Sequence, residues 1–205
     1  MNEFDDIRPY DDAEVPSVIS RLLRDNDFLD LLLSRRLPRL SNLVPVRFLM
    51  RPILRNSLAK LAADVSTVED FQAHMTSALR NTLDKTTDGV VFSGLHNLDK
   101  SQAYLFMSNH RDIALDPALI NLGLVEAEFN TVRIAIGDNL LRKPYASDLM
   151  RVNRSFIVKR SATGRREKLD ALKTLSSYIR HSICKEKVSC WIAQAEGRAK
   201  NGIDR

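Results

Sequence analysis

Short β-forming runs alternate with helical stretches after residue 88, and this alternation constrains the fold more than any other feature. The runs are GVVFSG, AYLFMS, TVRIAIG, SFIVKR and VSCWIAQ. Between them lie two helical stretches, DPALINLGLVEAE and REKLDALKTLSSYIRHSICK. Strands that alternate with helices are typical of an α/β domain with a largely parallel sheet flanked by helices. We predict such a domain over residues 87–205.

Residues 1–86 show helical spacing of apolar residues and no strand-like alternation. One helical stretch, PSVISRLLRDNDFLDLLLSRRL, occupies residues 16–37. Another is predicted from Ser66, because Ser66 and Glu69 have the spacing of a capping box that starts a helix. We therefore predict an N-terminal helical region over residues 1–86, preceding the α/β domain.

Residues 28–62 allow two interpretations. Bulky apolar side chains are interrupted there by Arg35, Arg36, Arg39, Arg47, Arg51 and Arg55. The segment either lies at a membrane interface or packs as an amphipathic helix against the main domain. It is too charged for a bilayer core, and no run in the sequence approaches the ~18 to 20 apolar residues that span one.

Composition and charge are those of a globular protein with an anionic partner. The chain has 205 residues, 44% of them apolar and 28% charged, which is enough for one well-formed core. The net charge is +5, but residues 1–14 are acidic and the remainder carries a net charge of +10. This excess favours nucleic acid, an anionic membrane surface or a phosphorylated small molecule, without choosing among them.

Export, metal binding and nucleotide binding are not expected. The acidic N-terminus differs from the basic start of a signal peptide. Cys184 and Cys190 form no CxxC pair, and we expect them to be reduced thiols in a cytoplasmic protein. The histidines do not suggest a metal site, and no nucleophile elbow, Walker loop or dinucleotide loop is present. The chemistry should therefore need no metal and no cofactor.

Polar segments follow three of the predicted strands. They are SNHRD after AYLFM, KRSATGRR after SFIV, and AEGRAKNG after VSCWIAQ. In a parallel sheet the carboxyl ends of the strands share one edge, where functional residues gather. The three segments together therefore predict a site at this edge.

The first polar segment offers a histidine and two carboxylates. His110 suits the removal of a proton at neutral pH, and a carboxylate can orient the ring and stabilise the imidazolium. Either Asp112 or Asp116 could be that carboxylate. The alternative is purely structural, because Asp116 followed by Pro117 is also a typical helix opening.

The second and third segments carry cations near glycines. Lys159, Arg160, Arg165 and Arg166 surround Gly164 immediately before a helix, as in many phosphate sites, although a solvated basic face has the same pattern. In the third segment Gly197 permits close backbone approach, and Glu196 can orient the guanidinium of Arg198.

Three segments of the chain resemble, in order, the first three sequence blocks of the glycerolipid acyltransferases. They are SNHRDIALDPAL, GDNLLRKPYASDLMRVNRSFIVKR and AEGRAKNG. That family includes glycerol-3-phosphate and 1-acylglycerol-3-phosphate acyltransferases, and the resemblance covers residues 89–202. Two departures indicate a divergent member. Five residues rather than four separate His110 from Asp116, and Arg198 follows Gly197 directly where the family has Glu-Gly-Thr-Arg. Because the family continues past the third block, we expect the domain to be incomplete at its C-terminus.

The resemblance implies transfer of a fatty acyl group from acyl-CoA or acyl carrier protein to a hydroxyl of a glycerol phosphate or lysophospholipid. His110 would be the general base, with Asp116 or Asp112 as its partner. The residues implied to hold the acceptor phosphate are Arg160, Glu196, Gly197 and Arg198. The helical region would dock the protein on the inner face of a membrane as a peripheral, cytoplasmic enzyme, without nucleic acid as a partner.

Two other function classes remain open at the level of the sequence. One is a non-catalytic protein that binds anionic lipid or nucleic acid through the basic edge, although aromatic residues, at 6%, are sparse for a base-stacking surface. The other is a His–Asp hydrolase of lipid esters or thioesters, which would consume acyl-CoA without an acceptor.

Overall fold

The computed structural model describes residues 3–39, 43–194 and 199. Contacts group the chain into two compact units. One unit comprises Met1–Pro9, His74–Leu140 and Arg154–Arg205, and the other comprises Tyr10–Ala73 and Leu141–Asn153. The predicted division of the chain into a helical region, residues 1–86, and an α/β domain, residues 87–205, stays a prediction.

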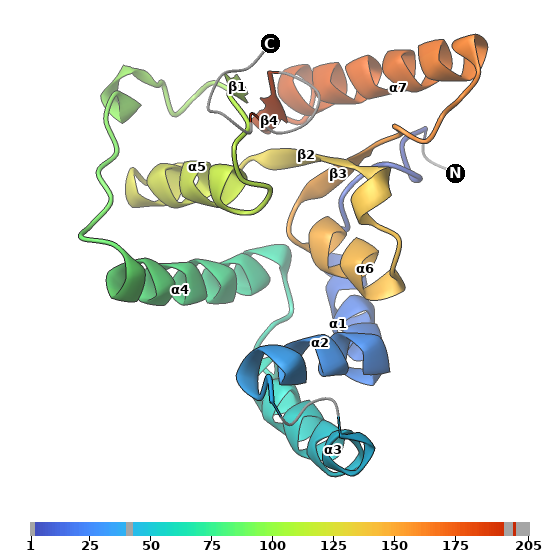
Figure 1. Ribbon diagram of the computed structural model, residues 1–205. Coiled ribbons are helices and arrows are strands. Elements are labelled where there is room, and N and C mark those ends of the chain that lie inside the picture. The colour runs from blue at the N-terminus through green and yellow to red at the C-terminus, as the bar shows by residue number, and fades with distance from the viewer. Residues whose placement is uncertain (1–2, 40–42, 195–198, 200–205) are drawn as a thin grey trace. The chain divides into compact units, whose positions relative to one another are not determined.

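A parallel sheet forms the centre of the first unit (Figure 1). Its strands are β1 (Leu105–Ser108), β2 (Arg133–Gly137), β3 (Ser155–Val158) and β4 (Cys190–Ala193). They lie in the order β1-β4-β2-β3, and every neighbouring pair is parallel. The predicted α/β fold class, with an N-terminal helical region, is confirmed.

Helices α5 (Leu115–Glu126) and α7 (Arg165–Cys184) cover opposite faces of this sheet. Neighbouring residues of β4 show the two faces, because successive strand side chains alternate. Cys190 is in the cluster that contains Tyr178 of α7, whereas Trp191 is in the cluster that contains Leu124 of α5. The crossovers from β1 to β2 and from β3 to β4 run in opposite directions across the sheet. With right-handed connections this places their helices on opposite sides.

The sheet divides into two strand pairs toward its carboxyl edge. β4 pairs with β1 along its whole length, and β2 pairs with β3 from Ile134 to Gly137. Between the two pairs, the ladder joining β2 and β4 contains only Arg133 with Cys190 and Ile134 with Trp191. The strand pairs are therefore joined near the beginning of the central strands and not at their carboxyl ends.

The predicted strand GVVFSG is wrong, because residues 89–94 form an irregular segment. Gly89 and Gly94 have φ angles of 126° and 81°, which are incompatible with a regular pleat. Phe92 lies against Gly123 of α5, where an added Cβ would be 2.7 Å from the ring. Phe92 thus packs on a helix instead of joining the sheet, whereas Val90 and Val91 are exposed.

The N-terminal segment of the first unit lies beside β3. The backbone N–H of Ile157 donates to the carbonyl of Ile7 at 2.9 Å, and Phe4 and Ile7 are buried with Tyr178. Asp6 forms an ion pair with Lys159. The first residues of the chain therefore contribute apolar side chains to the core of this unit and a carboxylate to an ion pair at its surface.

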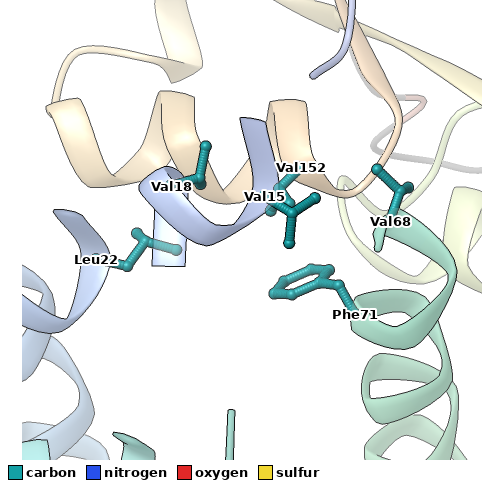
Figure 2. Packing of buried hydrophobic residues seen from close by; sticks show 6 residues of the cluster. All are labelled: Val15, Val18, Leu22, Val68, Phe71 and Val152. Carbon is teal, nitrogen blue, oxygen red and sulfur yellow. The ribbon is translucent and has the colours of Figure 1, made fainter. Parts of the chain in front are cut away.

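The second unit is helical. It contains α1 (Val15–Arg24), α2 (Asn26–Arg36), α3 (Val44–Leu61) and α6 (Pro144–Val152), and α4 (Val68–Thr86) begins in it. Figure 2 shows the core, formed by Val15, Val18, Leu22, Val68, Phe71 and Val152. A short 3₁₀ turn occurs in this unit at Asp12–Glu14, and two others occur in the first unit at Leu95–Asn97 and Asp138–Leu140. Among the helices of the described residues, none is both long and apolar enough to cross a membrane.

A buried carboxylate ties α1 to α6. The carboxylate of Asp148 accepts from the hydroxyl of Tyr10 at 2.8 Å. The guanidinium of Arg21 donates to its two oxygens, from Nε at 2.9 Å and from Nη2 at 2.8 Å. Because Asp148 is largely buried, losing either partner would leave its charge poorly compensated.

Candidate active site

The carboxyl edge of the sheet places two of the predicted polar segments on one rim. His110 follows β1, and Arg160 follows β3. The third segment includes Glu196, Gly197 and Arg198, which lie outside the described residues. Ala199 is described, and its backbone N–H donates to the carbonyl of His110 at 2.7 Å. This bond brings the chain at Ala199 against the His110 loop.

The imidazole of His110 contacts Asp116, which lies in the first turn of α5. His110 Nδ1 lies 2.9 Å from Asp116 Oδ2. The same oxygen accepts from the backbone N–H groups of Arg111 at 2.7 Å and Asp112 at 3.0 Å. These two backbone bonds fix the carboxylate relative to the loop. The ring is therefore held by an acceptor that is itself restrained.

This contact determines which ring nitrogen can act as a base. An ionised carboxylate only accepts hydrogen bonds, so the contact requires the proton on Nδ1 of His110. The lone pair then remains on Nε2, where it can accept a proton from a substrate. The side chains of His110 and Asp116 are 14% and 20% exposed, so the pair is only partly screened by water. The arrangement is suited to general base catalysis.

Asp112, the other predicted partner, makes different contacts. Its Oδ1 accepts from the backbone N–H groups of Ala114 and Leu115, both at 2.8 Å. These groups belong to the N-cap residue and the first residue of α5, so Asp112 holds the turn that leads into the helix. Asp116 lies in the first turn of α5, and its Oδ2 accepts from backbone groups of the preceding loop rather than from the helix. The structure thus brings Asp116 to the ring and uses Asp112 for the turn.

Trp191 is a neighbour of His110 that sequence reasoning missed. The two rings meet edge to face, with centroids 5.9 Å apart and planes at 67°. The indole N–H donates to Ser108 Oγ at 3.0 Å, and this hydroxyl donates to the carbonyl of Asn109 at 3.0 Å. The signal was available, since this tryptophan is unique in the chain and lies in a strand next to a polar strand end. Trp191 therefore restricts the position of the His110 loop through its contacts with the His110 ring and with Ser108.

Arg160 extends over the end of β2. A Cβ on Gly137 would lie 3.0 Å from Arg160 Cδ and 3.1 Å from its Nε, so this glycine makes room for the arginine. The side chain is exposed, and its guanidinium has no ion-pair partner among the residues described. Lys159, by contrast, pairs with Asp6. Of the two cations that directly follow β3, Arg160 is therefore the one available to an anion, and the exposed Arg165 and Arg166 follow at the start of α7.

Asp138 holds the backbone beside Arg160, and it was not predicted as a site residue. Its Oδ1 accepts from the N–H of Arg160 at 3.1 Å, and its Oδ2 accepts from the N–H of Ser161 at 3.2 Å and from the Ser161 hydroxyl. Burial raises the pKa of Asp138, but these hydrogen bonds together bring it below its usual value. An Asp directly after the strand RIAIG was the available sequence signal.

His110 and Arg160 follow the two edge strands of the sheet, β1 and β3. Three strand spacings of about 4.8 Å, or about 14 Å, separate these strands where the sheet is fully paired, and β2 and β4 are not paired at the carboxyl edge. The long side chain of Arg160 projects over Gly137 of β2, which reduces this separation. Arg165 and Arg166 begin α7 and are exposed. A bound molecule that reaches both His110 and Arg160 must therefore extend along the rim.

Comparison with known families assigns this edge to an acyl-transfer domain. A family model described as Acyltransferase matches residues 89–202, just over half of the chain. The match contains the strands and both polar rim segments described above. No curated protein matched the chain. The predicted resemblance is confirmed, and the chain belongs to the acyltransferase family.

Proposed function

We propose that this protein transfers a fatty acyl group from the thioester of acyl-CoA or acyl carrier protein to a hydroxyl of a glycerol phosphate or lysophospholipid. The observation that carries the proposal is the 2.9 Å contact between His110 Nδ1 and Asp116 Oδ2, at the carboxyl edge of a parallel sheet. Family membership supports acyl transfer in general. The acceptor class follows from the resemblance of the three sequence blocks and from the exposed Arg160.

In the first step, Nε2 of His110 takes the proton of the acceptor hydroxyl as the oxygen attacks the thioester carbonyl. Asp116 stabilises the imidazolium that forms, because its carboxylate accepts from Nδ1. The backbone donors of Arg111 and Asp112 keep that carboxylate in place while the ring becomes charged. The contribution of a positioned base is about 10² to 10⁴ in rate.

In the second step the tetrahedral intermediate breaks its carbon–sulfur bond. The sulfur leaves as a thiolate and takes the proton from Nε2, which returns His110 to its neutral state. The products are an oxygen ester and a free thiol. A thioester is already activated toward attack, so the exchange requires no change of oxidation state and no covalent enzyme intermediate.

Arg160 is proposed to bind the phosphate of the acceptor. A guanidinium binds phosphate through two parallel hydrogen bonds, and the exposed position of Arg160 beside Asp138 leaves its side chain accessible. Glu196, Gly197 and Arg198 are proposed to complete the acceptor site on the basis of the family resemblance. With this placement the acceptor hydroxyl would point toward His110 and its phosphate toward the β2–β3 side of the rim.

The acceptor specificity can be tested with the purified chain. Acyl-CoA consumption would be followed against glycerol 3-phosphate, lysophosphatidate and their unphosphorylated counterparts, with the lipid products identified by mass spectrometry. We expect ester products that depend on a phosphorylated acceptor. Thioester consumption at the same rate without any acceptor would support a hydrolase and contradict this proposal.

We propose further that the protein acts at a membrane surface, at the cytoplasmic face where acyl thioesters are available. A lysophospholipid acceptor and the ester products carry acyl chains, which partition into lipid. The net positive charge after residue 14 is compatible with an anionic surface. This part of the proposal is independent of the His110 chemistry and is developed from α3 below.

A further inference from the structure

Helix α3 carries its apolar side chains outward at its N-terminal half. Every exposed residue between 43 and 53 is apolar, and these residues are Leu43, Val44, Pro45, Phe48, Leu49, Pro52 and Ile53. Phe48 is 81% exposed, Val44 77% and Leu49 67%. Large contiguous apolar surface is unusual on a soluble protein and marks a site that another surface covers. We call these seven residues the α3 apolar face.

The arginines of α3 point the other way, toward α1 and α2. Arg51 Nε and Nη2 donate to the two oxygens of Asp30 at 2.8 and 2.6 Å. Arg47 also contacts this carboxylate, at 3.4 Å, and Arg55 Nε donates to the carbonyl of Leu23 at 2.9 Å. The hydrogen bonds to Asp30 lower the pKa of this carboxyl group. The helix is thus anchored through its cations, which leaves the apolar face outward.

The same inner side of α3 also packs against α2. Leu54 is buried with Leu29 and Leu33 of α2, and Met50 and Leu58 lie against them. Because these contacts occupy the inner side, rotating α3 to bury Phe48 would expose Leu54 and separate Arg51 from Asp30. The outward position of the apolar face is therefore fixed by contacts on the opposite side of the helix.

The stretch of sequence that contains the α3 apolar face is rich in basic residues and has no carboxylates. Residues 31–63 contain seven basic residues and no Asp or Glu. Arg35, Arg36 and Arg39 are exposed and form no ion pair among the described residues. They precede the α3 apolar face by only a few residues. An apolar surface next to unpaired cations complements an anionic lipid surface, which offers both phosphate groups and acyl chains.

We propose that the α3 apolar face inserts into the headgroup region of an anionic membrane, with Arg35, Arg36 and Arg39 contacting lipid phosphates. The inference deepens the proposed function by naming the surface that would bring the protein to its lipid substrates. The apolar side chains provide attraction that salt does not screen, and the arginines provide attraction that salt does screen. The charge of this region favours an anionic lipid surface as the occupant, because residues 31–63 carry seven basic residues and no carboxylate.

Vesicle sedimentation separates these contributions. The probe is mixed phosphatidylserine and phosphatidylcholine vesicles, compared with phosphatidylcholine alone, at low and at high salt. The double variant F48S/L49S should bind about tenfold or more weakly at both salt concentrations. The variant R35Q/R36Q should bind about tenfold more weakly at low salt and like the unsubstituted protein at high salt.

The matched control is L169S/L172S on α7. These two leucines are 51% and 59% exposed, against 81% and 67% for Phe48 and Leu49, so the control removes a smaller area of exposed apolar surface elsewhere. The control should bind vesicles like the unsubstituted protein. Because Phe48 and Leu49 make few contacts with the fold, F48S/L49S should unfold at an unchanged temperature.

Several results of the vesicle assay would overturn this inference. They are undiminished vesicle binding by F48S/L49S, an equal loss in L169S/L172S, and no vesicle binding by the unsubstituted protein. Concentration-dependent dimers that F48S/L49S abolishes, without vesicle binding, would also overturn it in favour of a second copy. Transfer of a short acyl chain to glycerol 3-phosphate in solution tests the proposed function separately, and F48S/L49S should leave that rate unchanged.

Discussion

Replacing Asp116 by Asn should slow acyl transfer by about 30- to 150-fold while the protein remains folded. The substitution keeps the size of the side chain and an oxygen that can accept from the backbone N–H groups of Arg111 and Asp112. It removes the negative charge that faces His110 when the ring takes the proton. The loss should therefore appear in kcat rather than in the free energy of unfolding.

The magnitude follows from the geometry of the pair. Opposite charges about 3 to 4 Å apart attract by about 4 kcal/mol at an effective dielectric constant of about 20, which suits a partly buried site. His110 Nδ1 and Asp116 Oδ2 are 2.9 Å apart, with 14% and 20% of their side chains exposed. A neutral amide oxygen still accepts a hydrogen bond, which contributes about 1 kcal/mol. About 2 to 3 kcal/mol of stabilisation of the imidazolium is then lost.

The assay is steady-state acyl transfer to the preferred phosphorylated acceptor, with circular dichroism to verify folding. Asp112→Asn is the matched control, because Asp112 Oδ1 accepts from Ala114 and Leu115 and the amide oxygen of Asn can accept from the same groups. It should retain most of the rate. A larger loss in Asp112→Asn than in Asp116→Asn, with both proteins folded, would refute the assignment of the partner.

Other expectations follow from Arg160, Asp138 and the two cysteines. Arg160→Ala should raise the KM of a phosphorylated acceptor about ten- to a hundredfold and leave the KM of the acyl donor nearly unchanged, whereas equal increases would make the arginine structural. Asp138→Ala should lower the free energy of unfolding, measured by urea titration above pH 3.8, because hydrogen bonds in the folded protein lower the pKa of Asp138 from that value. The difference from the unsubstituted protein should shrink as the pH falls through the lower pKa of the folded state. Iodoacetamide should label exposed Cys184 in the native protein but not Cys190, since burial raises the pKa of the Cys190 thiol to about 11. Rapid native labelling of both thiols would contradict the burial of Cys190.

The parallel sheet and its functional edge could be predicted because they depend on local patterns. β-forming runs separated by helical stretches leave few topologies, and parallel strands must end on one side. The position of His110 on that edge followed directly. Its partner did not follow, because Asp112 and Asp116 both lie within one loop and helix turn of the histidine. The choice depends on α5 beginning at Leu115, and helix boundaries vary by a residue or two in sequence reasoning.

Features that depend on contacts between distant residues could not be predicted. The run at residues 89–94 has strand composition, but Phe92 packs against Gly123, about thirty residues away, and two glycines adopt positive φ angles. The outward face of α3 depends on Asp30 and Leu23, which attract its arginines inward. Ordinary amphipathic reasoning places arginines toward water and apolar residues toward the core. In α3 specific hydrogen bonds draw three arginines inward, and apolar residues of its N-terminal half remain exposed, although Leu54 still packs inward.

The most direct test of the central claim is acyl transfer by His110→Ala, measured as the mass of esterified product formed from acyl-CoA and a phosphorylated acceptor. The variant should fold, because His110 is partly exposed and the backbone bonds between its loop and Asp116 do not involve the ring. The account predicts a loss of about 10²- to 10⁴-fold in rate. A folded His110→Ala protein that retains about a tenth of the original rate or more would contradict general base catalysis by this histidine.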